Sequence, residues 1–150
     1  MNFKDLMKFS EHHKNNNLEF LSNEEKEKYF RFDEKVYPAW TNKILKNITA
    51  YMIYNYNVSY NDVVKKLSSK QWMKDEGWRL PTIDELKALA MNNPKYFNFS
   101  YDFISGTTDE LNGNLIKFIE TTYTDKIRVG KCNKAFYLSM VAVLVTEKEF

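Results

Sequence analysis

Two stretches of the chain carry apolar residues at the spacing of an amphipathic helix. The first should end near residues 72–74; its N-cap is Ser59 or Asn61, and its apolar positions are Val63, Val64 and Leu67. The second begins at Thr82, because Thr82 and Glu85 fit a capping box, and it stops before Pro94. Its apolar face consists of Ile83, Leu86, Leu89 and Ala90. The pattern therefore predicts two helices that each turn one side to a core.

Strand-like patterns surround these helices. Apolar residues occupy alternate positions between residues 48 and 58, which favours a strand, with a helix as the rival interpretation. After residue 100 we expect strands at 103–107, 115–120, 126–129 and 135–145, with a tight turn at Leu111-Asn112-Gly113-Asn114 between the first two. The last strand is almost entirely apolar, so it should be central and buried on both faces.

The N-terminal part of the chain, up to about residue 45, has a helical character. Its signals are Phe3, Leu6 and Met7 at helical spacing, a polar break at 12–17, a capping box at Ser22 and Glu25, and a turn at Pro38. With 4 glycines, 3 prolines and no internal repeat, the sequence offers no boundary between domains. We therefore expect one domain over 1–150, in which a helical extension, 1–45, precedes a core, 46–150.

Composition says more about the compartment and the general class of the protein than about its activity. The chain has 150 residues, and its 22 Lys and Arg against 20 Asp and Glu give a net charge of +2. This near balance does not indicate nucleic-acid binding by the molecule as a whole. No apolar run has the length of a signal peptide or a membrane span, so we expect a cytoplasmic protein without membrane contact. A single cysteine, Cys132, allows neither an intramolecular disulfide nor a paired-cysteine zinc site.

A short motif lies between the two predicted helices. Residues 77–82 read Gly-Trp-Arg-Leu-Pro-Thr and are followed by Ile83, Asp84, Glu85 and Leu86, after an amphipathic run that begins at Asn61. This composite resembles the Lcl C-terminal domains of bacterial and phage proteins over about residues 57–145. The resemblance implies an α+β fold of the C-type-lectin-like kind, with two helices packed on a small, mostly antiparallel sheet. Such domains are distantly similar to the formylglycine-generating enzyme domain.

The chain also departs from this family. It lacks the family's tryptophan before the Ser/Thr pair of residues 104–108, the arginines of the closing strand, and the cysteine in the helix before Gly77. We therefore interpret the motif as structural. Trp78 should pack in the core, and Arg79 should brace the fold by bonding to carboxylates or carbonyls. Leu80 and Pro81 should direct the chain into a helix whose start is capped by Thr82 and Glu85.

Familiar patterns for catalysis and metal binding are absent from the sequence. It contains no nucleophile elbow, Walker-type loop or dinucleotide fingerprint. The oxidation that the formylglycine-generating enzymes perform depends on a cysteine pair, which this chain lacks. We interpret the oxygens of Asp109, Glu110, Asn112 and Asn114 as a solvated turn rather than a calcium site, and His12 and His13 as part of a polar loop. We expect no catalytic residue, no metal and no cofactor.

Two groups of residues are candidates for contact with a partner. The first is a basic cluster around an expected turn at 130–133, made of Tyr123, Lys126, Arg128, Lys131 and Lys134. Cationic side chains beside an aromatic ring suit an acidic protein surface, with nucleic acid as the alternative partner and a solvated hairpin as the structural one. The second group is the tyrosines Tyr51, Tyr54, Tyr56 and Tyr60.

These observations favour a non-catalytic module that binds a protein partner inside the cell. The resemblance to phage domains suggests a phage or mobile-element origin, and an inhibitor of a host defence complex such as CRISPR is one such role. Two other classes of function stay open. The chain could be an enzyme with an unrecognised site on a scaffold like that of the formylglycine-generating enzyme, or an exported adhesin that binds a ligand at the cell surface.

Overall fold

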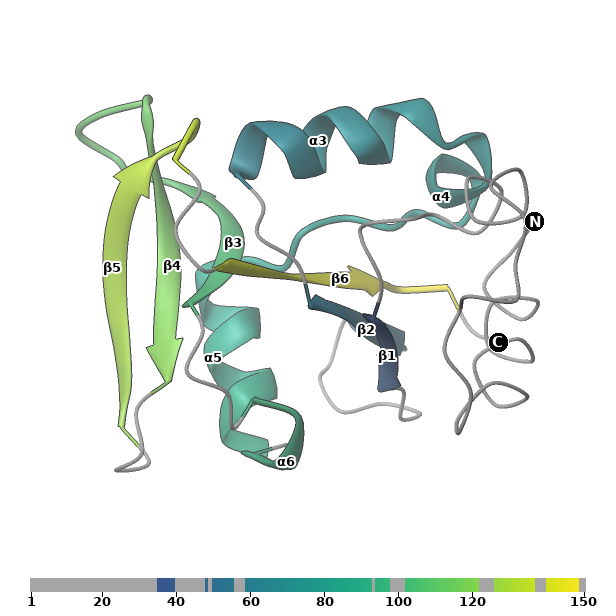
Figure 1. Ribbon diagram of the computed structural model, residues 1–150, viewed down its shortest axis with the longest axis horizontal. Helices are drawn as coiled ribbons and strands as arrows, with labels where there is room; N and C mark the ends of the chain where they lie inside the picture. The colour runs from purple at the N-terminus through teal and green to yellow at the C-terminus, as the bar shows by residue number, and fades with distance from the viewer. Residues whose placement is uncertain are drawn as a thin grey trace.

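The computed structural model has an α+β architecture in which a mixed sheet carries helices on both faces (Figure 1). It describes residues 35–39, 48, 50–55, 59–92, 94–97, 102–121, 126–136 and 140–148, with the backbone alone in 35–39, 50–55 and 95–96. The α+β class expected from the sequence is confirmed. The expected N-terminal helices before residue 35, with the capping box at Ser22 and Glu25, lie outside the described residues.

Six strands form the sheet of the described chain. They are β1 (Lys35–Ala39), β2 (Ala50–Asn55), β3 (Asp102–Thr108), β4 (Leu115–Thr121), β5 (Ile127–Asn133) and β6 (Met140–Thr146), in the spatial order β1-β2-β6-β3-β4-β5. β3 and β6 run parallel, whereas the other neighbouring pairs are antiparallel. The expectation of a mostly antiparallel sheet is therefore met.

β1 corrects the expectation that helical structure extends to residue 45 with a turn at Pro38. Lys35–Ala39 pairs along its length with β2, and Pro38 lies opposite Met52. β1 is the edge strand of the described sheet, and an edge is where a sheet tolerates proline, which has no amide hydrogen to donate. The strand interpretation of residues 48–58 is confirmed over Ala50–Asn55.

β6 is the centre of the molecule, as its apolar sequence predicts. All seven of its residues are buried, and it lies between β2 and β3. The strand begins at Met140 rather than at Ala135, because residues 134–136 form a turn after β5. In that turn the amide of Phe136 donates to the carbonyl of Asn133, and the amide of Ala135 donates to the Asn133 side chain.

Helices cover the two faces of the sheet. α3 (Tyr60–Ser69) and α4 (Gln71–Asp75) lie over one face, and α5 (Ile83–Asn92) with α6 (Pro94–Phe97) lies over the other (Figure 1). Of the two predicted caps of α3, the structure uses Ser59, whose hydroxyl accepts from the amide of Asp62. The pattern did not predict the break at Lys70, whose extended backbone separates α3 from α4.

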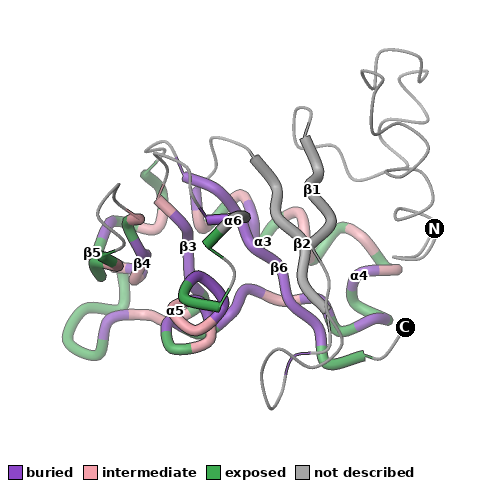
Figure 2. Tube along the Cα trace, turned by 90° about the horizontal axis from the view of Figure 1, so that it is seen from below, coloured by how far each residue is buried: buried purple, intermediate pink, exposed green. Residues whose placement is uncertain are grey.

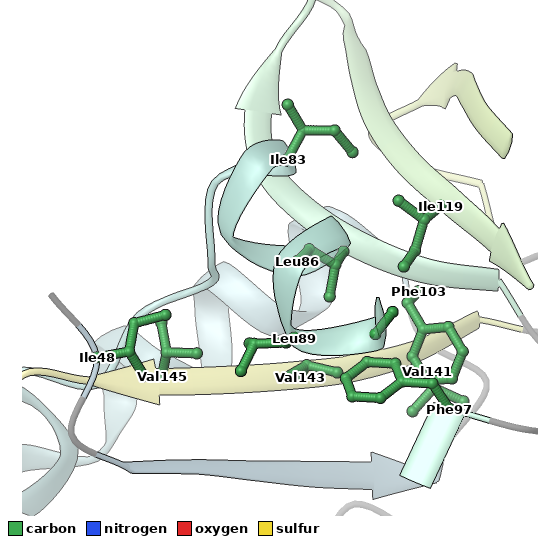
Figure 3. Close-up of a cluster of buried hydrophobic side chains, with 11 residues drawn as sticks. Ile48, Ile83, Leu86, Leu89, Phe97, Phe103, Ile119, Val141, Val143 and Val145 are labelled. Atoms are coloured by element: carbon green, nitrogen blue, oxygen red, sulfur yellow. The ribbon is translucent and has the colours of Figure 1, made fainter. Parts of the chain in front are cut away.

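Two apolar cores result, one on each face. The first contains Val63, Met73, Trp78, Leu80, Ile104, Ile116, Cys132, Met140, Ala142 and Leu144. The second contains Ile48, Ile83, Leu86, Leu89, Ala90, Phe97, Phe103, Ile119, Val141, Val143 and Val145, most of which Figure 3 labels between α5, α6 and the sheet. Successive residues of β6 join opposite cores, because strand side chains alternate between faces. The tube of β6 is therefore buried along its length (Figure 2).

Cys132 belongs to the first core rather than to a reactive site. Its side chain is buried, and burial raises the pKa of its thiol, with a smaller contribution from Asp102. A thiol of raised pKa is a weak nucleophile at neutral pH. Among the described helices, none has the length and apolar character needed to cross a bilayer.

Candidate functional site

The Gly77 to Thr82 segment begins by closing α4. Gly77 has a φ of +69°, a conformation that glycine adopts without steric cost. The amide of Gly77 donates to the carbonyl of Lys74, and the amide of Trp78 donates to that of Met73. These two bonds form a Schellman motif, whose usual apolar contact is supplied by Trp78 and Met73 in the first core.

The middle of the segment is bonded to two strands. Arg79 and Val145 exchange two backbone hydrogen bonds, at 2.9 and 2.8 Å, so that Arg79 extends the sheet beside β6. The amide of Gly106 on β3 donates to the carbonyl of Pro81. The segment thus fills the space between the diverging ends of β3 and β6 and fixes the point where α5 begins.

The start of α5 is capped as the sequence predicts. The amide of Glu85 donates to the Thr82 hydroxyl at 3.2 Å, and the amide of Thr82 donates to the Glu85 carboxylate at 2.8 Å. Another bond comes from the amide of Ile83, which donates to the Thr107 hydroxyl on β3. These bonds satisfy amides that a helix start otherwise leaves unpaired.

Arg79 braces this start through both kinds of partner predicted for it, the carboxylate of Glu85 and, at 3.3 Å, the carbonyl of Leu80. Its guanidinium donates to both oxygens of Glu85, at 2.7 and 3.0 Å, and lies 3.5 Å from Glu147. The guanidinium lowers the pKa of Glu85, and the amide of Thr82 lowers it further. The contacts described for the motif are internal to the fold, which agrees with its structural interpretation.

A different region, the turn at residues 109–114 between β3 and β4, contains several local hydrogen bonds. The amide of Asp109 donates to the carbonyl of Leu115, and the amide of Leu115 donates to that of Asn112. The side chain of Asn112 accepts from the amide of Asn114, an arrangement for which asparagine is common in turns. The Asn-Gly-Asn signal of the sequence therefore forms the turn that it predicts.

Ion pairs fix this turn to the strands below it. The Lys131 ammonium of β5 lies 2.7 Å from a carboxylate oxygen of Asp109, and the Lys117 ammonium of β4 lies 2.6 Å from Glu110. The Asp109 side chain is 4% exposed, whereas that of Lys131 is 47% exposed. Lys131 lowers the pKa of Asp109, and the amides of Leu111 and Asn112 lower it further.

A second turn, at residues 134–136, adjoins the first. The amide of Lys134 donates to the carbonyl of Asn114, and the amide of Asn61 at the start of α3 donates to the carbonyl of Lys134. The Lys134 ammonium lies 5.1 Å from the centroid of the Tyr60 ring, within the range of a cation–π contact. We call residues 109–114 and 134–136 together the paired turns.

The paired turns present large apolar side chains to solvent. Leu111 is 93% exposed and Phe136 is 56% exposed, although the backbone around each is hydrogen-bonded. Sequence reasoning missed both residues, because it assigned Leu111 to a turn signal and Phe136 to a buried strand. A leucine next to Asn-Gly-Asn was the signal that could have identified the first.

The predicted basic cluster does not come together as expected. Residues 130–133 are part of β5 rather than a turn, and the turn follows at Lys134. Arg128 and Lys131 lie on opposite faces of β5, because they are separated by an odd number of positions in a regular ladder. Lys131 contacts Asp109, Lys134 contacts Tyr60, and Lys126 is exposed just before the strand. Tyr123 lies outside the described residues.

The tyrosine group is not a described surface either. Tyr60 is half-buried against the first core. Tyr51 and Tyr54 are on β2, where the backbone alone is described, and Tyr56 lies outside the described residues.

Among the described residues, no three or more His, Cys, Asp or Glu side chains are grouped so that they could hold a metal ion. Comparisons with protein-family models, with curated proteins and with solved structures found no match to the chain. Any assignment of function therefore depends on the contacts of the chain itself.

Proposed function

We propose that the chain is a non-catalytic, intracellular protein-binding module and that the paired turns are its contact surface. The observation that carries this proposal is the pair of exposed side chains, Leu111 and Phe136, on turns that hydrogen bonds and ion pairs hold in place. A lone exposed apolar residue needs no explanation, but these two lie on turns that a backbone hydrogen bond joins, from the amide of Lys134 to the carbonyl of Asn114.

The rigidity of the paired turns supports binding. Side chains on a backbone that is already ordered lose less conformational entropy when a partner covers them, so more of the contact energy contributes to affinity. Leu111 and Phe136 would serve as the apolar centre, and Lys131 and Lys134 as part of a polar rim. Lys131 and Lys134 are members of the basic cluster that the sequence indicated.

The finer fold and the biological setting belong to the same proposal. A C-type-lectin-like domain related to the Lcl C-terminal family is supported by the motif at 77–82, whose residues support two strands and the start of α5. The resemblance to phage domains supports a phage or mobile-element protein, for which inhibition of a host defence complex such as CRISPR is a suitable role.

A capture experiment with three proteins tests the contact surface. Wild type, the double variant Leu111→Asp with Phe136→Ser, and the control Met91→Asp would be immobilised and exposed to a lysate of the cells that encode the chain. Met91 is a matched control, because it is 73% exposed at the end of α5. We expect one protein to be retained by wild type and control, and to be reduced at least about 10-fold by the double variant.

Equal capture by all three proteins would show that the paired turns are not the contact surface. Retention of no protein by wild type, together with co-purification of a small molecule, would contradict the binding-module function itself. Circular dichroism of each variant would confirm that the fold is retained.

A further inference from the structure

β5 is the edge strand at the end of the described sheet opposite β1, and no described strand lies beyond it (Figure 1). It pairs with β4 over seven consecutive positions, from Ile127 opposite Thr121 to Asn133 opposite Leu115, without a bulge. β5 also contains no proline. A regular strand of this length without bulge or proline lacks two of the devices that usually prevent an edge from pairing with another strand.

The hydrogen-bond register identifies the outward backbone groups of β5. In an antiparallel ladder, residues alternate between bonding to the neighbouring strand and pointing away from it. Lys134 donates to the carbonyl of Asn114 and therefore belongs to the inward set. Counting back from Lys134 along the regular register, the outward residues are Ile127, Val129, Lys131 and Asn133. These four residues present their amides to an added strand, together with the carbonyls of Ile127, Val129 and Lys131, whereas the carbonyl of Asn133 already accepts from the amide of Phe136.

The side chains along this edge leave room for such a strand. Lys131 is the residue type that usually guards an edge, but its ammonium is held by Asp109. Gly130 has no side chain, and the ring of its partner Phe118 lies over it. Val129 is 44% exposed, and it offers apolar surface at the centre of the outward row.

The charge of the edge indicates the kind of strand that it suits. Residues 126–134 include Lys126, Arg128, Lys131 and Lys134 and no acidic residue. The Arg128 side chain is exposed opposite Glu120, while Lys126 is exposed just before the strand. A second copy of β5 would bring cations against cations, which is unfavourable between paired strands. An acidic strand would meet opposite charges.

We propose that β5 binds an extended acidic segment of a partner protein, which adds to the sheet as a further strand. This inference rests on the proposed protein-binding function and specifies its mode. Backbone hydrogen bonds to the outward row would supply affinity, and the cations around β5 would select acidic sequences.

A synthetic probe tests the mode directly. A peptide of about seven residues that alternates glutamate with valine, the length of a typical strand, would be titrated into the ¹⁵N-labelled full chain. We expect slower hydrogen exchange at the amides of the outward row, Ile127, Val129, Lys131 and Asn133. A peptide with lysine in place of glutamate should not produce this protection at the same concentration.

Two substitutions at one position separate backbone from side-chain effects. Val129→Pro removes one outward amide while leaving the bonds to β4, and the control Val129→Thr keeps that amide with a side chain of the same shape. We expect Val129→Pro to weaken peptide binding at least 10-fold and Val129→Thr to leave it within about 2-fold. N-methylation of alternate amides on the peptide gives the same test without altering the protein. In a paired strand alternate amides face β5 and the others point away, so methylation of only one of the two sets should abolish binding.

A second pair of variants tests the charge. Lys126→Gln with Arg128→Gln should weaken peptide binding about 5-fold or more at low salt, by removal of two nearby cations. The control, Lys65→Gln with Lys74→Gln, removes the same charge from exposed positions on α3 and α4 and should leave binding unchanged.

Several outcomes would overturn the inference. These are protection of amides outside β5, equal binding by Val129→Pro and Val129→Thr, and tighter binding of a single-stranded oligonucleotide than of the acidic peptide. The double variant Leu111→Asp with Phe136→Ser could abolish capture of a cellular protein while Val129→Pro leaves that capture unchanged. In that case the β5 inference fails and the proposed function stands. If the wild type captures no protein and a small molecule co-purifies with it, the proposed function fails whatever the peptide does.

Discussion

Gly130 on β5 lies directly against the ring of Phe118, its partner on β4. A methyl group at Gly130 would come within 2.3 Å of the Phe118 ring, closer than carbon atoms approach one another. An aromatic ring that covers a cross-strand glycine is a known means of fixing register near a sheet edge. The small residue therefore contributes packing to the hairpin that leads into the paired turns.

We expect Gly130→Ala to reduce the free energy of unfolding by about 1–3 kcal/mol, because the Phe118 ring must leave its position. Urea denaturation followed by circular dichroism measures this change. Gly113→Ala is the control, because a methyl group there has no atom within 4 Å, and its effect should stay within about 0.5 kcal/mol. Equal effects of the two substitutions would contradict the packing of Phe118 over Gly130.

At the scale of one element, the start of α5 depends on an ionised Glu85. Its carboxylate accepts from Arg79 and from the amide of Thr82, and these partners lower its pKa in the folded protein. A carboxyl group with a lowered folded pKa stabilises the fold above its unfolded pKa of about 4.3. That stabilisation is lost as the pH falls through the lower folded value.

We therefore expect wild type to lose stability more steeply than Glu85→Gln as the pH is lowered from about 5 to 3. Glutamine can still bond to the Thr82 amide, so the substitution removes the titrating charge and keeps the cap. Arg79→Met should flatten the same part of the profile, and the double variant should add little to either one. Chemical denaturation at a series of pH values measures these slopes, and parallel profiles for wild type and Glu85→Gln would refute the account.

Elements differ in how well the sequence predicts them. α5, its cap at Thr82 and the central β6 were predicted, because capping boxes and long apolar runs are local signals. β1 was not, because its strand conformation depends on pairing with β2 and its proline signalled a turn. The end of β5 was misplaced by Gly130, a residue typical of turns that here makes room for a ring from another strand.

The candidate site was harder to predict than the fold. The sequence places Arg128 and Lys131 close together, but the strand directs them to opposite faces, and the partner of Lys131 is Asp109, from a distant part of the chain. The turn signal beside Leu111 is the local indication of its exposure, and Phe136 has none, since only the packed structure determines which apolar residues are left in solvent.

At the scale of the whole molecule, β6 makes the two cores one cooperative unit. Its residues alternate between the core under α3 and the core under α5, so disruption of either core disturbs the same strand. Met73 represents the first core and Leu89 the second, and both are fully buried.

We expect Met73→Ala and Leu89→Ala each to cost about 2–5 kcal/mol and to unfold the protein in a single transition. Tryptophan fluorescence, to which Trp78 of the first core contributes, and far-UV circular dichroism should give coincident urea curves for both variants. A Leu89→Ala curve in which fluorescence and circular dichroism diverge would indicate that the cores unfold separately.

The position of β6 in the sequence also affects folding during translation. β6 follows all the other described strands, yet it lies between β2 and β3. Until the ribosome has released residue 146, β2 and β3 have no partner between them, and their pairing edges remain open. Nascent chains of this protein must therefore pass through a period in which these strands are available to chaperones or to one another.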